Sequence, residues 1–307
     1  MVTLLRQHQW PAKSQTSWTC EQRSHQPVLA QQSIYWLNGK PGGIYVDATA
    51  GSGGHTALLL QVQGVKVIGL DKDEEAIRYL SQRFAGYENF KAIHGGFEEM
   101  IKLLAEIGIH QVDGVLFDLG LSRDQVKDAE RGFSFQIDGP LDMRYDRSRG
   151  YTAADILNTW KRDQLVALFR NYGEIKHPEK VVQEIMQQRK KVPFSRTGQL
   201  SSLICSLVRR RGHRHPATLF FQALRLAVNN ELECLSAGLE QARQLLRKSG
   251  RIVVISFHSL EDRIVKHFFA GCADFSILTK KPVVPDFNLI KTHPESRSAR
   301  LRAAEKI

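Results

Sequence analysis

Short apolar strands that alternate with helices are the feature that most restricts the fold of this chain. Residues 43–48, 65–70, 90–94 and 112–117 form β-rich runs, and helix-like segments at 55–60, 73–84 and 100–107 follow the first three. Consecutive units of this kind place their strands in parallel, with helices covering both faces of the sheet. The sequence therefore predicts an α/β fold with a parallel-type sheet.

The alternation stops after the fourth strand. Residues 123–216 contain helix-like segments, 152–169 and 178–190, but no clear strand. The pattern resumes with a long helix at 217–248 closed by Gly250, a strand at 251–256, a helix at 260–269, an edge strand at 275–281 and a basic tail. We predict one α/β domain from residues 24–122 and 217–307, a helical substrate-recognition domain inserted at 123–216, and a flexible N-terminal extension at 1–23.

Composition excludes several classes of protein. The chain has 307 residues, of which 42% are hydrophobic, enough for a core without disulfides. Its aliphatic runs are far shorter than the roughly 20 residues that a membrane span needs. The first 20 residues lack the apolar segment of a secretory signal, and the four cysteines show neither CxxC nor metal-finger spacing. We expect a cytoplasmic protein with no disulfide, no membrane contact and no metal.

A glycine turn follows the first strand. Residues 47–55 read DATAGSGGH, and glycines there allow a tight turn and the close approach of a ligand. Thr56 stands where the dinucleotide motif GxGxxG has its third glycine, which weakens the case for a pyrophosphate. S-adenosylmethionine has no phosphate and suits the turn better. An ordinary strand-to-helix turn explains the glycines about as well.

Three side chains are expected at the same edge of the sheet. Asp71 ends the second strand, where an acidic residue accepts hydrogen bonds from ribose hydroxyls, unless it caps the next helix in place of Asp73. Phe97 follows the third strand and either contacts an adenine or belongs to the core. His258 follows the strand at 251–256 and either lines the site or precedes a helix capped by Ser259.

Asp118 ends the fourth strand, at the edge where open α/β sheets hold reacting groups. An exocyclic amine conjugated to a ring needs an acceptor for its N–H as a methyl group arrives. The carboxylate of Asp118, the hydroxyl of Ser122 or a backbone carbonyl in this segment could supply one. A nucleic acid base would have to be flipped out and stacked on an aromatic ring. Phe133, Phe135 and Tyr145 are candidates for that ring, or they fill the core of the insert.

Positive charge is concentrated in one region. The chain carries a net charge of +11, and residues 186–225 contain nine Lys or Arg and no Asp or Glu. The tail adds Lys291, Arg297, Arg300 and Arg302. These clusters are typical of contact with a phosphate backbone, although a solvated face is the ordinary alternative.

Several longer motifs run from His25 almost to the end of the chain. They are HQPVL at 25–29, DATAGSGGH at 47–55, FDLG at 117–120, RGFSF at 131–135, DGPLDMR at 138–144, FSRT at 194–197, HPAT at 215–218, FQALR at 221–225, SFHSLEDR at 256–263 and SRSARLR at 296–302. With these motifs the chain resembles the MraW (RsmH) family, the cytosine-N4 methyltransferases of small-subunit ribosomal RNA.

The resemblance implies a Rossmann-like class I methyltransferase with an inserted helical domain. Its cofactor would be S-adenosylmethionine, and its substrate a cytidine in the decoding region of 16S rRNA in the small ribosomal subunit. By motif match, the cofactor contacts are Gly53, Gly54, His55, Asp71, Phe97, Asp118 and Gln125. The predicted catalytic residues are Asp118 and Ser122, from their place at the end of the fourth strand. The oligomeric state stays open, a homodimer included.

The chain departs from the family pattern at three places. Arg123 and Asp124 replace the usual Ser-Pro before Gln125, Tyr145 replaces a Met, and Glu295 stands where the tail usually has an Arg. Two other functions compete with methyl transfer: a nicotinamide-dependent oxidoreductase, which the missing third glycine disfavours, and a non-catalytic RNA-binding assembly factor, which the intact Asp71 and Asp118 disfavour.

Overall fold

A seven-stranded mixed sheet forms the centre of the molecule. The computed structural model describes residues 27–210 and 215–307, so the predicted extension at 1–23 lies outside the described residues. The strand order is β3-β2-β1-β4-β5-β7-β6. The strands are β1 (Ile44–Asp47), β2 (Lys66–Asp71), β3 (Phe90–His94), β4 (Val112–Asp118), β5 (Leu246–Ser256), β6 (Phe275–Ile277) and β7 (Arg300–Lys306). The first five are parallel, and β7 runs antiparallel to both β5 and β6.

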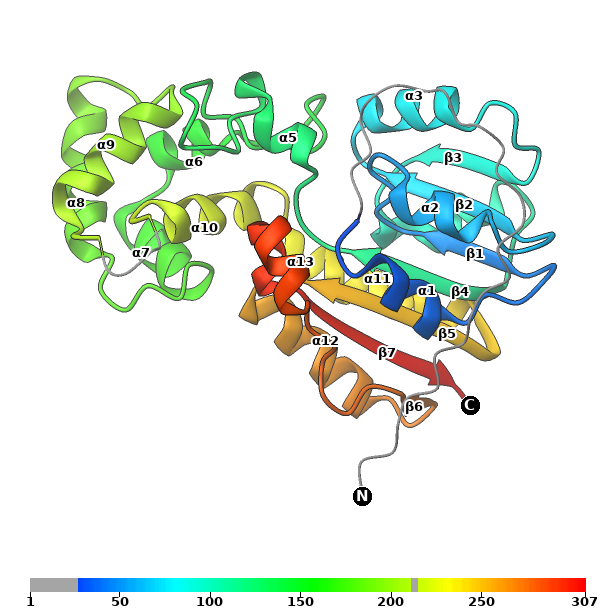
Figure 1. Cartoon of the computed structure of the whole chain (residues 1–307). Helices are drawn as coiled ribbons and strands as arrows, with labels where there is room; N and C mark the ends of the chain where they lie inside the picture. The colour runs from blue at the N-terminus through cyan, green and yellow to red at the C-terminus, as the bar shows by residue number, and fades with distance from the viewer. Residues whose placement is uncertain (1–26, 211–214) are drawn as a thin grey trace.

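Helices cover both faces of this sheet (Figure 1). Side chains of α4 (Met100–Ala105), α11 (Glu231–Leu245) and α12 (Ser259–Gly271) share one apolar core with the strands. On the other face lie α1 (Ala30–Leu37), α2 (Gly54–Leu59), α3 (Glu74–Arg83) and α13 (Phe287–Thr292), with 3-10 turns η1 (Phe97–Glu99) and η3 (Pro294–Ser298) in the connections. Alternate residues of β5 enter the two cores, Ile252 one and Val253 the other, which explains its uninterrupted apolar sequence.

The remaining helices gather to one side of the sheet (Figure 1), and most of them enclose a core separate from the two at the sheet. They are α5 (Arg123–Lys127), η2 (Ala129–Arg131), α6 (Ala153–Thr159), α7 (Arg162–Asn171), α8 (Glu179–Lys191), α9 (Thr197–Leu207) and α10 (Thr218–Val228). Phe220, Phe221 and Leu224 of α10 are buried in this core. The predicted domain boundary between residues 216 and 217 therefore assigns α10 to the α/β domain, although α10 packs in the core of the inserted helices. The rest of the division into domains stays a prediction.

Two predicted helices are wrong in length. The helix at 217–248 is interrupted at Asn229 and Asn230, and Asn230 adopts a left-handed conformation with φ 51°, which Asn tolerates better than most residues. It also ends at Leu245, because β5 begins at Leu246, so Gly250 caps nothing. The helix at 152–169 is likewise divided, since α6 ends at an extended Trp160.

The basic tail was not predicted as a strand, yet its last part is β7. Leu301, Ala303 and Ala304 are fully buried between helical layers, and Arg302 is 8% exposed. The guanidinium of Arg302 donates to Asp262 of α12 at 2.7 Å, and Arg300 donates to the same carboxylate at 2.9 Å. These two arginines hold β7 against α12, so the prediction that both contact phosphate is wrong for the buried Arg302 and weakened for Arg300.

Within the described ranges, no helix is long and apolar enough to cross a bilayer. Cys205, Cys234 and Cys272 are all free thiols, while Cys20 lies outside the part of the chain that the structure describes. The edge strand predicted at 275–281 is present as the shorter β6.

Candidate active site

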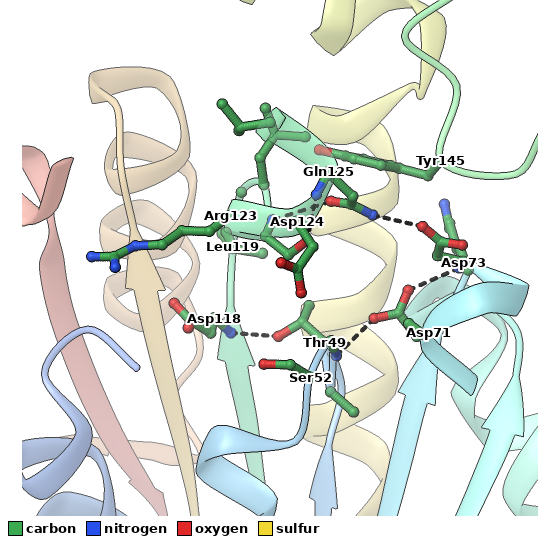
Figure 2. A pocket seen from close by; sticks show the side chains of 18 of the residues that line it. Thr49, Ser52, Asp71, Asp73, Asp118, Leu119, Arg123, Asp124, Gln125 and Tyr145 are labelled. Carbon is green, nitrogen blue, oxygen red and sulfur yellow. Dashed lines mark hydrogen bonds between the residues drawn. The ribbon is translucent and has the colours of Figure 1, made fainter. Parts of the chain in front are cut away.

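A cavity of about 870 Å³ opens at the carboxyl edge of the sheet, where β1, β2 and β4 end. Each of these neighbouring strands ends in an aspartate: Asp47, Asp71 and Asp118. The chain order reverses between β1 and β4, and such a switch point is where open α/β sheets bind ligands. Figure 2 shows Asp71 and Asp118 on opposite sides of this opening, with Thr49 and Ser52 between them.

The glycine turn closes the floor of the cavity. The N–H of Gly51 donates to Asp71 at 2.8 Å, and the N–H of Gly53 donates to the carbonyl of Ala50 at 2.7 Å. Gly53 has φ 79°, and a Cβ there would lie 2.6 Å from the ring of Phe84. Gly53 thus faces the core beneath α3 and does not line the cavity, whereas Gly54 and His55 do. Gly53 therefore has a conformational role in the turn, and its contact with the cofactor stays a prediction.

Asp71 is held by backbone donors on both sides. Oδ2 of Asp71 accepts the N–H of Gly51, and its Oδ1 accepts the N–H of Asp73 at 2.8 Å. The side chain of Asp73 caps α3 by accepting the N–H of Glu75. Burial raises the pKa of Asp71 to about 6, although the N–H groups of Asp73 and Gly51 oppose the shift. Asp73 is therefore the cap, and Asp71 remains available to the cavity.

Asp73, which sequence reasoning treated only as a cap, also joins the insert to the sheet. Its carboxylate accepts Arg131 at 2.7 Å and the amide of Gln125 at 3.0 Å. Arg131 is almost fully buried, and its guanidinium also donates to the carbonyls of Arg144 and Tyr145. The signal in the sequence was the RGFSF motif, whose arginine has no other buried carboxylate partner among the described residues.

Ser122 and Gln125 form a capping box at the start of α5. The hydroxyl of Ser122 accepts the N–H of Gln125 at 3.1 Å, and the side chain of Gln125 accepts the N–H of Ser122 at the same distance. Both residues line the cavity. Because its oxygen serves the helix, Ser122 fits a structural role better than the predicted catalytic one, and Gln125 is fixed between α5 and Asp73.

Asp118 is placed as the sequence predicts. Its N–H donates to the hydroxyl of Thr49 at 2.7 Å, and one carboxylate oxygen, Oδ2, lies 3.2 Å from Nε2 of His55. The other oxygen, Oδ1, is buried and has no hydrogen-bond partner within the described residues. The side chain as a whole is 21% exposed and borders the cavity, where a carboxylate can accept a hydrogen bond or a proton from a bound amine.

Phe97 forms the wall at the β3 side. Its ring lies 5.3 Å from that of Phe117 in an edge-to-face arrangement and 5.8 Å from Nζ of Lys72, which pairs with Glu98 at 2.6 Å. Behind it, Gly238 of α11 leaves room that a Cβ would fill. Phe97 is thus packed on the core and also borders the cavity, so its core role is confirmed and its contact with an adenine stays a prediction.

Of the three aromatic candidates from the insert, only Tyr145 lines the cavity. Its ring stacks on Phe133 at 5.5 Å, its hydroxyl donates to Glu231 at 3.2 Å, and its N–H donates to Asn229 at 2.8 Å. Phe135 stacks instead on His215. Tyr145 is therefore the ring that the structure presents to a ligand.

His258 does not line the cavity, contrary to one of its two predicted roles. Its ring nitrogen accepts the N–H of Glu261, so His258 rather than Ser259 caps α12. The neighbouring Phe257 and Glu261 line the cavity in its place.

Arg123 and Glu295, two of the residues that depart from the family pattern, contact each other. The guanidinium of Arg123 on α5 pairs with Glu295 of η3 and with His293, and both Arg123 and Glu295 border the cavity. The two substitutions therefore complement each other across its mouth.

Several of the predicted RNA-binding cations are engaged within the protein. Arg225 forms a two-point pair with Glu231, Arg189 donates to the carbonyls that end α6, and Arg196 pairs with Asp138. Lys190, Lys191, Arg209 and Arg210 are exposed, and Arg211 and Arg214 lie outside the described residues. The predicted basic face is thus smaller than the sequence suggests.

The cavity fits a cationic ligand. Nine Asp or Glu border it against five Lys or Arg, and two N–H groups of the glycine turn are already bonded within the protein. A pyrophosphate would meet carboxylates here instead of free donors, which counts against a nicotinamide cofactor. The sulfonium of S-adenosylmethionine suits the same surroundings. Within the described ranges, no group of three or more His, Cys, Asp or Glu could hold a metal ion.

Comparison with known proteins identifies the family of this chain. Residues 22–307 match the sequence profile of the MraW methylase family. The chain belongs to this family. Ribosomal RNA small subunit methyltransferase H of Thermomicrobium roseum is 45% identical over 308 residues, covering 92% of this chain and 94% of that protein. The protein of the same name from Carboxydothermus hydrogenoformans is 42% identical, covering 92% and 98%.

A solved structure of an rRNA methylase from Streptococcus thermophilus covers 90% of this chain and 95% of its own, at 13% identity and a TM-score of 0.45. Membership of the MraW methylase family confirms the predictions of an α/β class I methyltransferase fold, of methyltransferase activity and of S-adenosylmethionine as cofactor. The assignment of individual residues to cofactor and catalysis stays a proposal.

Proposed function

We propose that this protein transfers a methyl group from S-adenosylmethionine to N4 of a cytidine in the decoding region of 16S rRNA. The observation that carries the proposal is the carboxylate of Asp118, which ends β4 at the border of the cavity with its side chain 21% exposed. Family membership and the names of the relatives support the substrate class.

Asp118 performs the central step in this scheme. The cofactor supplies an electrophilic methyl group on a sulfonium. The carboxylate of Asp118 accepts the N–H of the cytosine amine, which localises the nitrogen lone pair as N4 bonds to the methyl carbon and the carbon–sulfur bond breaks. The proton that N4 then loses passes to Asp118. Asp71 binds the ribose hydroxyls, and Phe97 packs against the adenine.

The target base must leave its stack to reach Asp118, because N4 is not accessible at this depth otherwise. Tyr145 is placed to stack on the flipped base, since it borders the cavity and its ring is fixed by Phe133 and Glu231.

Mass spectrometry of nucleosides tests the function. Small-subunit RNA from cells lacking this activity is incubated with the protein and isotopically labelled S-adenosylmethionine, as free RNA and as assembled subunit. We expect labelled N4-methylcytidine in at least one of the two. RNA binding without methyl transfer would favour the assembly-factor alternative, and binding of a nicotinamide dinucleotide would favour the oxidoreductase.

Cofactor affinity should fall at acidic pH through Asp71. A pKa of about 6 leaves the carboxyl largely protonated at pH 5, where it has lost its anionic acceptor. We expect the affinity for S-adenosylmethionine to be about tenfold weaker at pH 5 than at pH 7, in proportion to the ionised fraction. Calorimetry across this range measures the effect. In Asp71→Asn the affinity should be weaker at pH 7 and change much less with pH; an equal slope in both proteins would assign the titration to another group.

We propose that the exposed cations of α8 and of the segment after α9 contact RNA phosphates. Each phosphate contact on single-stranded RNA contributes about 0.7 to the slope of log affinity against log salt. Reversing Lys190, Lys191 and Arg209 to Glu should therefore lower the slope by roughly 1.5 to 2, measured with a small-subunit rRNA fragment. The cofactor site lies at another face, so its affinity should not change.

A matched control reverses Lys248, Lys266 and Lys280, which are exposed on the α/β part of the molecule and give the same change in net charge. If both triple variants alter the slope equally, the effect comes from net charge alone, and the proposed RNA face is wrong. A cytoplasmic location and a homodimer remain predictions from the sequence.

A further inference from the structure

His55 lies between two of the aspartates that end the central strands. It follows Gly54 in the first turn of α2, and its side chain is only 4% exposed. Its Nε2 lies 3.2 Å from Oδ2 of Asp118 on β4. Asp47, at the end of β1, accepts a hydrogen bond from the hydroxyl of Thr56 at 2.8 Å. Its carboxyl group also interacts electrostatically with the imidazole of His55.

Three polar atoms of this cluster are buried without a hydrogen-bond partner in the described residues: Oδ1 of Asp47, Nδ1 of His55 and Oδ1 of Asp118. Unpaired buried polar atoms are costly, and in native proteins they are concentrated at sites with a chemical role. Of the three residues, His55 and Asp118 line the cavity and Asp47 does not. Asp47 therefore lies behind His55 and Asp118 as seen from the cavity.

We propose that His55 is a positioning residue for Asp118: it donates Nε2–H to Oδ2, which fixes the orientation of the carboxylate at the border of the cavity and places a positive charge beside it. This inference rests on the proposed function of Asp118. It differs from the prediction by motif match, which gives His55 a direct contact with the cofactor.

The surroundings favour a charged imidazole. The charged groups that face the ring are Asp118 from β4 and Asp47 from β1, both acidic. Burial lowers the pKa of His55, but the hydrogen bond to Asp118 and the two negative charges outweigh burial, so its pKa lies above the usual value. Burial in turn raises the pKa of Asp47, partly offset by His55 and Thr56.

Two substitutions separate the hydrogen bond from the charge. His55→Gln keeps an N–H donor near the position of Nε2 but carries no charge, whereas His55→Phe removes both. We expect kcat of His55→Gln to stay within about tenfold of wild type at pH 8, with the acidic limb of its pH profile moved up by about one pH unit. For His55→Phe we expect kcat to fall by about 10²-fold at every pH. The affinity for S-adenosylmethionine should stay within about threefold in both.

A second measurement does not depend on the variants folding. Nitrogen-15 NMR of labelled histidine in the full-length protein reports the protonation of each ring nitrogen, with His55 assigned by its absence from His55→Gln or by sequential connectivity. We expect both nitrogens of His55 to carry a proton at pH 7. A neutral ring would overturn the charge part of the proposal.

The outcomes distinguish this inference from the proposed function. If wild type transfers methyl groups and His55→Gln has the wild-type pH profile, the positioning role is wrong and the proposed function stands. Weakened cofactor affinity with unchanged kcat at saturation would instead make His55 a cofactor contact. If wild type forms no N4-methylcytidine on either substrate, the proposed function itself fails, and only the NMR result still bears on the ion pair.

Discussion

Asp118→Asn is expected to lower methyl transfer by a factor of about 10² to 10⁴, the range over which a positioned acid or base contributes to a rate. The amide keeps the shape of the carboxylate and can still accept a hydrogen bond from His55 with its oxygen. The amide carries no negative charge, however, and it cannot take up the proton that the substrate amine loses. Single-turnover assays with small-subunit RNA at saturating cofactor measure the loss directly.

Asp124→Asn provides the matched control, because Asp124 borders the same cavity and undergoes the same chemical change. It should retain transfer to within a few fold. Ser122→Ala tests the other predicted catalytic residue and should cost mainly the cap of α5, typically about 1 kcal/mol. If Asp118→Asn turns over at the wild-type rate while Ser122→Ala does not, the acceptor is the hydroxyl, and the scheme proposed for Asp118 is wrong.

Arg131→Met is expected to destabilise the protein by about 3 to 5 kcal/mol, because it leaves a buried carboxylate without its counter-charge. Arg131 and Asp73 pair at 2.7 Å, with side chains only 4% and 8% exposed. The same change removes two hydrogen bonds that hold the backbone at Arg144 and Tyr145. Denaturant unfolding, followed by a probe in the insert and another in the sheet, measures the loss.

The double variant Arg131→Met with Asp73→Asn checks the cause. Asn removes the charge of Asp73 yet still caps a helix about as well, so α3 should keep its start. We expect the double variant to be more stable than Arg131→Met alone. If removing the charge restores nothing, or if Arg131→Met costs less than about 1 kcal/mol, water reaches Asp73 and the pair does not act as a buried ion pair.

The strands and the chemistry at their ends could be predicted from the sequence because both are local. Five apolar runs ending in polar residues define β1 to β5, and parallel pairing brings the ends of neighbouring strands to one edge. Asp71 and Asp118 follow directly from that rule. Their positions required no knowledge of any side-chain contact.

Contacts between distant residues were not accessible in the same way. The buried charge of Arg131 finds its partner 58 positions away, and His55 meets Asp118 across 63 positions. Local sequence also misled where a single conformation interrupts a regular pattern. The apolar spacing at 217–248 continues through Asn229 and Asn230, and only the left-handed Asn230, with Asn229 bonded to the carbonyl of Met143, divides it.

Charge counts were the least reliable guide. Arg225 and Arg302 belong to basic stretches in the sequence, but each is paired with a carboxylate that the sequence places elsewhere, Glu231 and Asp262. A run of like charges therefore says little about a free basic surface until the partners from other segments are known.

The position of β7 also bears on how the chain is assembled during translation. β7 is synthesised after β6, yet it lies between β5 and β6 in the finished sheet. Until residues 300–306 leave the ribosome, β5 exposes a full row of unpaired backbone groups and β6 has no neighbour, and such open edges can pair with other chains. If translation ended before this segment, the truncated chain would contain β1, β2 and β4 with their terminal aspartates. Its sheet would have open edges at β5 and β6 and would be prone to aggregation.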